Sequence, residues 1–182
     1  VERVLSLEEY ELLLSDSMPM DFADVTEDEL AGLFYTGGTT GRSKGVMLSH
    51  RNLIANTLHS QITMPLDGED TYLIVAPMFH AAGSNSVLQC VALGICQIVV
   101  PAFETNLCLD LIEKHRCSAT LAVPTMVAAM IDAQAQNHRD TSSPRLIAHG
   151  ASPIATEVLR RAHEAFSNDE LLNLYGATAR KR

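Results

Sequence analysis

A segment rich in glycine and threonine, residues 36–45, holds the side chains best suited to bind an anion. It places four glycines, three threonines and one lysine in ten positions. Glycines let successive backbone N–H groups point into one concavity, and hydroxyls and an ammonium add further donors. Lys44, the only lysine before Lys114, lies between Ser43 and Gly45, so its order differs from that of a Walker loop. We predict a polyphosphate-binding loop, with an ordinary glycine hairpin as the alternative.

Three further polar or glycine-containing segments follow apolar runs. They are 77–80 (Pro-Met-Phe-His), 149–153 (His-Gly-Ala-Ser-Pro) and 175–178 (Tyr-Gly-Ala-Thr). If the apolar runs are parallel strands, their carboxyl ends meet at one edge of a sheet, which is where open parallel sheets bind ligands. The pattern therefore predicts one site assembled from distant parts of the chain.

The elements that position these segments alternate between strands and helices. Apolar runs predict strands at 31–36, 46–48, 71–76, 95–100, 118–123, 145–149 and 171–175. Helical patterns cover 7–14, 49–63, 82–93, 105–116, 124–136 and 153–166, with start signals at Ser49, Pro124 and Ser152-Pro153. Nearly continuous apolar strands are typical of strands buried on both faces. We predict an α/β fold, a mostly parallel sheet with helices on both faces.

Composition excludes several classes of function. A net charge of −9 and a pI of about 5.1 argue against a nucleic-acid-binding face. The four cysteines form no Cys-x-x-Cys pair and lie in apolar or helical contexts, so we expect buried free thiols, no metal site and a cytoplasmic protein. The longest apolar stretch, 87–101, is interrupted and too short for a transmembrane segment.

Five segments in order resemble motifs of the adenylate-forming (AMP-binding) acyl-CoA synthetase superfamily. They are the 36–45 loop, 77–83, 123–126, 150–153 and 175–178. The spacing matches from residue 30 onward, and 150–162 is most similar to fatty-acyl-CoA ligases. The resemblance implies a two-step reaction that uses ATP, Mg²⁺ and coenzyme A. A carboxylate attacks the α-phosphate to give acyl-AMP and pyrophosphate, and the coenzyme A thiol then displaces AMP.

The resemblance also implies roles for particular residues. The β- and γ-phosphates would be held by Thr36, Gly37, Gly38, Thr39, Thr40, Gly41 and Lys44. Adenine would lie between the backbone of Gly150, Ala151 and Ser152 and the ring of Tyr175, beside Gly176. His80, Lys44 and Thr178 would be catalytic, with Thr178 at the α-phosphate and His80 between the acid and the coenzyme A channel.

The same site residues have plainer interpretations. Tyr175 could be a core residue that closes a strand, Thr178 a helix N-cap, and His80 a hydrogen-bonded histidine at a strand end. His149 is at most a residue that lines a pocket.

The acid is predicted to be apolar. No Asp, Glu, Lys or Arg occurs from Thr71 to Phe103, so the ammonium of an amino acid would find no partner there. Phe79, Val123, Met126 and the predicted 82–93 helix are candidate walls. A fatty acid is the leading substrate, and an aryl or shorter acid is the alternative.

Two features depart from the superfamily pattern. Ala179 stands where the superfamily has a Glu that binds Mg²⁺, so we predict no metal ligand here, and the sequence ends at Arg182. We expect a central fragment of the large N-terminal domain. Residues 1–29 would form an N-terminal helix and acidic linker, and 30–182 a partial AMP-binding domain without the C-terminal domain. Alone it would not complete turnover, and uncovered apolar faces would make it self-associate. A truncated, non-catalytic nucleotide-binding or assembly module is the alternative of another class.

Overall fold

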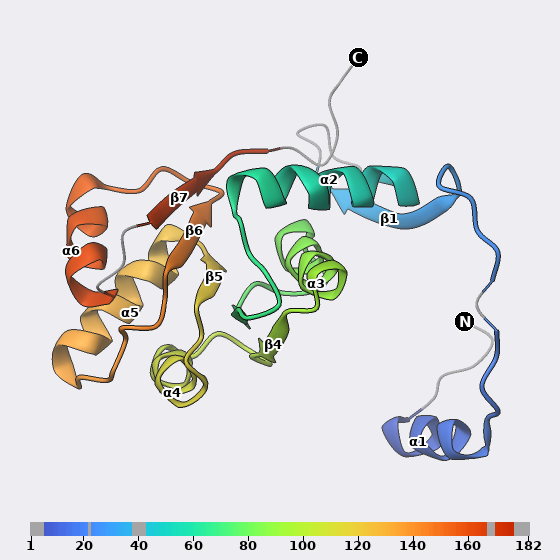
Figure 1. Cartoon of the computed structure of the whole chain (residues 1–182), viewed down its shortest axis with the longest axis horizontal. Helices are drawn as coiled ribbons and strands as arrows, with labels where there is room; N and C mark the ends of the chain where they lie inside the picture. Colours follow the sequence, from blue (N-terminus) through green and yellow to red (C-terminus); the bar gives the residue numbers. More distant parts are fainter. Residues whose placement is uncertain (1–5, 22, 38–42, 167–169, 177–182) are drawn as a thin grey trace.

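A five-stranded parallel sheet forms the centre of the computed structural model, which describes residues 6–21, 23–37, 43–166 and 170–176 (Figure 1). The strand order is β4-β3-β5-β6-β7, and every neighbouring pair is parallel. The strands are β3 (Thr71–Ile74), β4 (Cys96–Val99), β5 (Ala119–Ala122), β6 (Leu146–Gly150) and β7 (Glu170–Leu174). The predicted α/β fold with a mostly parallel sheet is confirmed.

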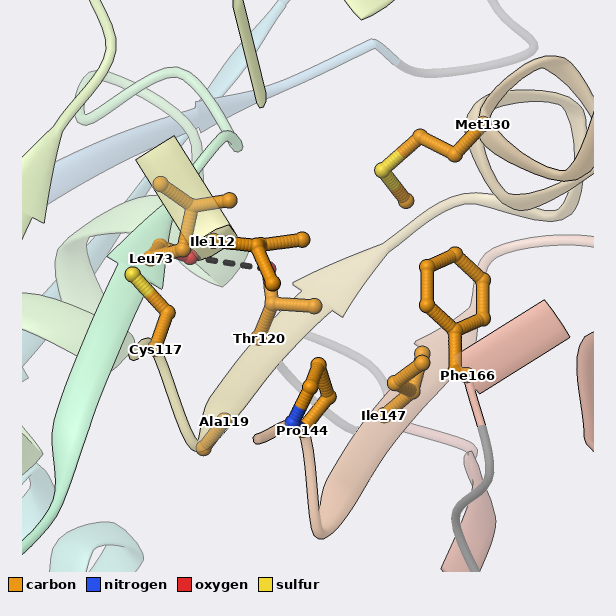
Figure 2. A pocket seen from close by; sticks show the side chains of 9 residues that line it. All are labelled: Leu73, Ile112, Cys117, Ala119, Thr120, Met130, Pro144, Ile147 and Phe166. Carbon is orange, nitrogen blue, oxygen red and sulfur yellow. Dashed lines mark hydrogen bonds between the residues drawn. The ribbon is translucent and has the colours of Figure 1, made fainter. Parts of the chain in front are cut away.

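Helices cover both faces of this sheet. On one face lie α4 (Thr105–His115), α5 (Pro124–Gln136) and α6 (Thr156–Phe166), and on the other lies α3 (Ala81–Leu93). Successive strand side chains point to opposite faces, so Leu73 joins the core with α4–α6 while Tyr72 and Ile74 join the core with α3. Figure 2 shows the first core, where the gap between the side chains is too small for a water molecule. Thr120 Oγ1 donates to the carbonyl of Leu73 at 2.8 Å there, so its buried hydroxyl has a partner.

A separate antiparallel hairpin precedes the sheet. It pairs β1 (Leu30–Thr36) with β2 (Lys44–Ser49), which confirms the predicted strand–loop–strand arrangement. Ser49 caps α2 (His50–Thr63) as predicted, since its hydroxyl accepts from the Asn52 N–H and its own N–H donates to Asn52 Oδ1. At the N-terminal end, α1 spans Leu7–Asp16.

The described part of α2 buries no residue, and Ile54, Leu58 and Ile62 are all more than half exposed. This apolar stripe is of the kind that marks interfaces. A single chain does not test self-association, which stays a prediction. Among the described residues, no helix is long and apolar enough to cross a membrane.

Two predictions about local structure were wrong. Cys90, Cys108 and Cys117 are buried, and burial raises their pKa values to about 12, 11 and 11, but Cys96 is exposed because it begins the edge strand β4. The last helix begins at Thr156 and not at Pro153. Ala151 adopts a left-handed conformation with φ of 69°, which redirects the chain before a helix can start.

A polar cluster joins three elements at the amino edge of the sheet. The Asp70 carboxylate, 5% exposed, accepts from Arg145 Nη2 at 2.6 Å, from Arg145 Nε at 3.0 Å and from Ser118 Oγ at 2.6 Å. The Asp67 N–H donates to it at 2.9 Å. Burial alone would raise the pKa of Asp70, but these hydrogen bonds outweigh it and hold the pKa below the usual 3.8.

Candidate functional site

An open groove of about 840 Å³ lies between the hairpin and the turn that leads into α3. Residues 32–37 of β1 and its loop line one part of it, and residues 78–81 line the other. The structure thus brings together two segments that the sequence analysis selected independently. None of the ten lining residues is Asp, Glu, Lys or Arg, as expected for a site that accepts an apolar acid.

The hairpin holds both ends of the predicted phosphate loop. Thr36 pairs directly with Lys44 across the two strands, and Thr36 Oγ1 donates to the Lys44 carbonyl at 3.4 Å. Lys44 is exposed, as are Thr36's neighbours Tyr35 and Gly37. Gly38, Thr39, Thr40 and Gly41 lie outside the described residues. Antiparallel pairing therefore fixes Lys44 at the end of the groove wall, on the strand opposite Thr36.

His80 is held at the N-terminus of α3. Its Nδ1 accepts the Ala82 N–H at 3.2 Å, and its own N–H donates to the Pro77 carbonyl at 2.9 Å. A histidine whose Nδ1 accepts carries its proton on Nε2. The exposed ring therefore caps α3 with one nitrogen and has an N–H on the other. The histidine is hydrogen-bonded, as its plainer interpretation expected, but at the start of a helix and not at the end of a strand.

Gly83 lets α3 pack tightly against the backbone of Ala76 and Pro77, just after β3. A Cβ at this position would lie 2.2 Å from the Pro77 carbonyl oxygen and 2.6 Å from that of Ala76. Both are backbone atoms that a side-chain rotation cannot move. The absence of a Cβ is therefore what allows the first turn of α3 to lie directly against the segment that follows β3.

The second group of predicted residues meets at the carboxyl ends of β6 and β7. Gly150 pairs with Leu174, and a Cβ on Gly150 would lie 2.6 Å from the Leu174 carbonyl oxygen. The next residues on the two strands, Ala151 and Tyr175, therefore leave the sheet side by side. Tyr175 is fully exposed, so the interpretation as a core tyrosine was wrong. Ser152 and Gly176 are also exposed, while Thr178 and Ala179 lie outside the described residues.

The predicted site residues do not all line the same pocket. Phe79 lines the groove and is 89% exposed, but Val123 and Met126 do not line it, and Met126 packs against the core under α4–α6. The Gly150–Ser152 turn is not part of the groove lining either. β3 and β6 nevertheless flank β5, so both groups lie at the same carboxyl edge.

His149, which the sequence analysis treated as at most a pocket-lining residue, has an unusual environment at this edge. His149 is 2% exposed, and its Nδ1 is buried without a hydrogen-bond partner among the described residues. Burial lowers the pKa of this ring, which keeps it neutral. The available signal was a lone histidine within the apolar run 146–149.

The described residues offer no metal site. No group of three His, Cys, Asp or Glu side chains in this part of the chain is placed to hold a metal ion. The groups at hand are hydroxyls, backbone N–H groups, one lysine and neutral histidine nitrogens. They can bind phosphate oxygens and polarise a carboxyl or phosphate group by hydrogen bonding.

The chain is similar to known proteins in both sequence and structure. The sequence profile of the family described as "AMP-binding enzyme" matches residues 3–179. The chain is 34% identical over 171 residues to 4-coumarate–CoA ligase 1 of Arabidopsis thaliana, covering 87% of this chain and 29% of that protein. It superposes on a long-chain-fatty-acid–CoA ligase, FadD1, from Archaeoglobus fulgidus with a TM-score of 0.77 and 31% identity, covering 87% of this chain and 32% of that one.

A further solved structure, ATP-bound MatB from Rhodopseudomonas palustris, superposes with a TM-score of 0.78 and 28% identity, covering 93% of this chain and 33% of MatB. The chain thus spans about a third or less of the length of each of these relatives.

Proposed function

The chain belongs to the AMP-binding enzyme family, and we propose that it forms the phosphate- and acid-contacting part of an AMP-forming acid–CoA ligase. In this reaction a carboxylate oxygen attacks the α-phosphate of ATP, pyrophosphate leaves, and the thiol of coenzyme A then displaces AMP from the acyl-AMP. The observation that carries the proposal is the groove in which the Lys44 hairpin meets the His80 turn.

The hairpin end of the groove suits the β- and γ-phosphates of ATP. Lys44 is not among the lining residues, but it pairs with Thr36 at the end of the groove wall and supplies a positive charge there. None of the described lining residues is a carboxylate that would repel the phosphates. Gly38, Thr39, Thr40 and Gly41 belong to this proposal through the family motif. Pyrophosphate leaves with several negative charges, so groups that hold them stabilise the transition state. Mg²⁺ would neutralise part of that charge when bound, but the described residues offer no ligand set for it, and we assign it none.

The adenine ring is proposed to bind at the β6–β7 edge. The exposed Tyr175 directly follows Leu174, which pairs with Gly150 at the start of the turn formed by Gly150, Ala151 and Ser152. A phenol face that stacks on a purine contributes about 1–3 kcal/mol. Gly176 would leave space for the nucleotide, and Thr178 is proposed to contact the α-phosphate.

His80 is proposed to act on the reacting carboxylate. Its Nδ1 is occupied by the Ala82 N–H, so its Nε2–H is the free donor. The ring lines the groove beside Phe79, where an apolar acid could lie with its carboxylate toward the hairpin. A donor at this place would orient the carboxylate and, in the second step, the acyl carbonyl.

The acid itself is proposed to be apolar, for which two classes are supported. FadD1, named as a long-chain-fatty-acid ligase, supports the fatty acid that the sequence analysis put first. The plant relative, named as a 4-coumarate ligase, supports an aryl acid about equally well. The uncharged groove lining is compatible with both.

Isothermal titration of ATP with Mg²⁺ into the chain tests the proposal. We expect saturable binding that Lys44→Ala weakens at least about tenfold, since charge-assisted hydrogen bonds contribute about 1.5–3 kcal/mol. Lys114→Ala is the matched control, because Lys114 is an exposed lysine in the last turn of α4, remote from the groove. Equal affinity of the Lys44→Ala variant, or no binding by the unmodified chain, would contradict the proposed role of the hairpin in this chain.

A further inference from the structure

Two side-chain amides on neighbouring helices each have a buried atom without a hydrogen-bond partner among the described residues. On α2 this atom is Gln61 Oε1, an acceptor, and on α3 it is Gln89 Nε2, a donor. We propose that ATP binding draws α2 toward α3 until Gln61 Oε1 accepts from Gln89 Nε2, and that this movement narrows the groove. The inference rests on the proposed function and assigns both glutamines as positioning residues.

The two amides border the same core. α2 packs beside α3 (Figure 1), and Gln89 is 2% exposed. Gln61 Nε2 donates to the Leu66 carbonyl at 2.6 Å, and Leu66 packs in the core that contains Cys90, the neighbour of Gln89. Buried polar atoms without a hydrogen bond destabilise a fold, so they are uncommon and call for an explanation. A donor and an acceptor at one helix pair explain each other if they pair in a second, closer arrangement.

The hairpin and α2 are joined as one unit. Ser49 ends β2 and caps α2. The segment before β1 also bonds to the first turn of α2, since the Arg51 N–H donates to the Glu27 carbonyl at 2.7 Å. The His50 N–H donates to the Glu29 carbonyl at 3.2 Å. A shift of α2 is therefore carried to β1, which forms one wall of the groove.

α3, in contrast, is fixed to the sheet. Tyr72 of β3 and Ser86 of α3 share a buried hydrogen bond of 3.2 Å, and Gly83 lies directly against the backbone that follows β3. His80 and Ala81, at the start of α3, line the opposite wall of the groove. The described part of α2 buries no residue, so a shift of α2 exposes little apolar area. The distance between α2 and α3 therefore sets the width of the groove.

A ligand that contacts both units favours the closer arrangement. In the proposed binding mode, the β- and γ-phosphates lie at the Lys44 hairpin and adenine lies at the β6–β7 edge of the sheet. A ligand shifts an equilibrium by its difference in affinity for the two states, and ATP makes both sets of contacts in full only when the two units approach. We expect a movement of about 1–2 Å, as is usual for helices that shift in switching transitions.

The first test measures the distance between the helices. Spin labels are attached at two exposed positions, through Asn56→Cys on α2 and Val91→Cys on α3, with Cys96→Ser to remove the exposed native thiol. We expect ATP with Mg²⁺ to shorten the mean distance by about 1–2 Å. The control pair, Val91→Cys with Lys114→Cys on α4, should not change, because both helices belong to the sheet unit. An unchanged 56–91 distance in a protein that binds ATP by titration would overturn the inference alone, whereas a titration without binding contradicts the proposed function.

The second test asks whether the two amides act together. We expect Gln61→Leu and Gln89→Leu each to weaken ATP binding about two- to tenfold, as the loss of one hydrogen bond does. The double variant should bind no more weakly than either single variant. Gln136→Leu, at the exposed end of α5, is the matched control and should leave the affinity unchanged. Losses that multiply in the double variant, or single variants with unchanged affinity, would overturn the inference.

Unfolding in urea without ATP separates a positioning role from a purely structural one. Both atoms lack a partner in the free protein, so the effects of Gln61→Leu and Gln89→Leu on the free energy of unfolding should add. Clear coupling between the two substitutions would show that the amides already pair without ATP, and would overturn the inference.

Discussion

Replacing Gly83 by alanine probes how closely the His80 turn must approach the sheet. The new Cβ would lie 2.2 Å from the Pro77 carbonyl oxygen and 2.6 Å from that of Ala76. Heavy atoms in contact are normally about 3.5–4 Å apart, so the start of α3 would have to move away by more than about 1 Å.

Two opposing effects set the size of the result. Alanine favours a helix over glycine by about 1 kcal/mol. Overpacking of a well-packed contact costs about 1–3 kcal/mol, and the upper part of that range applies because both clashing atoms belong to the backbone. We therefore expect Gly83→Ala to lower the free energy of unfolding by about 1–2 kcal/mol, against the helix propensity.

The measurement is urea unfolding followed by far-ultraviolet circular dichroism, since the chain has no tryptophan. Gly68→Ala is the control, because a Cβ there would lie 3.7 Å from its nearest neighbour, an ordinary contact. It should change the free energy of unfolding by less than about 0.5 kcal/mol.

The same variant should weaken binding in the groove, since His80 and Phe79 line it and belong to the displaced turn. A Gly83→Ala protein that is as stable as the unmodified chain, with unchanged ligand affinity, would refute the reasoning from this close approach.

Two further predictions concern the amino edge and the β6 turn. Asp70→Asn should lower the free energy of unfolding by about 2–3 kcal/mol at neutral pH, because it leaves Arg145 without its anion. Since the folded-state pKa of Asp70 lies below 3.8, the carboxylate contributes fully above that value and its contribution is lost as the pH falls through the lower pKa. Urea unfolding at decreasing pH should thus show the difference narrowing, and a difference independent of pH would contradict the assignment. Ala151→Gly should raise the free energy of unfolding slightly, by up to about 1 kcal/mol, because relief of the left-handed φ exceeds the added entropy of the unfolded chain. A thermal or urea midpoint well below that of the unmodified chain would contradict this.

Much of the local structure could be predicted from the sequence. The hairpin around residues 36–45, the cap at Ser49 and the proline at the start of α5 all follow from short-range chemistry. Glycines, N-cap hydroxyls and the period of apolar residues act over a few positions, so they can be interpreted without knowledge of the fold. Where a left-handed residue intervened, at Ala151, the predicted start of α6 was wrong by three residues.

The order of the strands in the sheet could not be predicted from the sequence, and the exposure and contacts of several residues depend on it. Cys96 is exposed because β4 lies at the edge of the sheet, and an apolar run does not reveal whether its strand is central or peripheral. The Asp70 carboxylate accepts hydrogen bonds from Arg145, which lies 75 positions later in the chain.

By itself, then, the sequence determined the family, the alternation of strands and helices, and the residues that are predicted to bind phosphate. These depend on residue types at short spacing. Only the tertiary structure decided that the Lys44 hairpin and the His80 turn share a groove, that Gly83 must lack a Cβ, and that the His149 nitrogen is buried without a partner. Each of these depends on how the backbone is placed in three dimensions: the Gly83 contact depends on the turn that leads into α3, and the other two depend on how separate elements pack around the sheet.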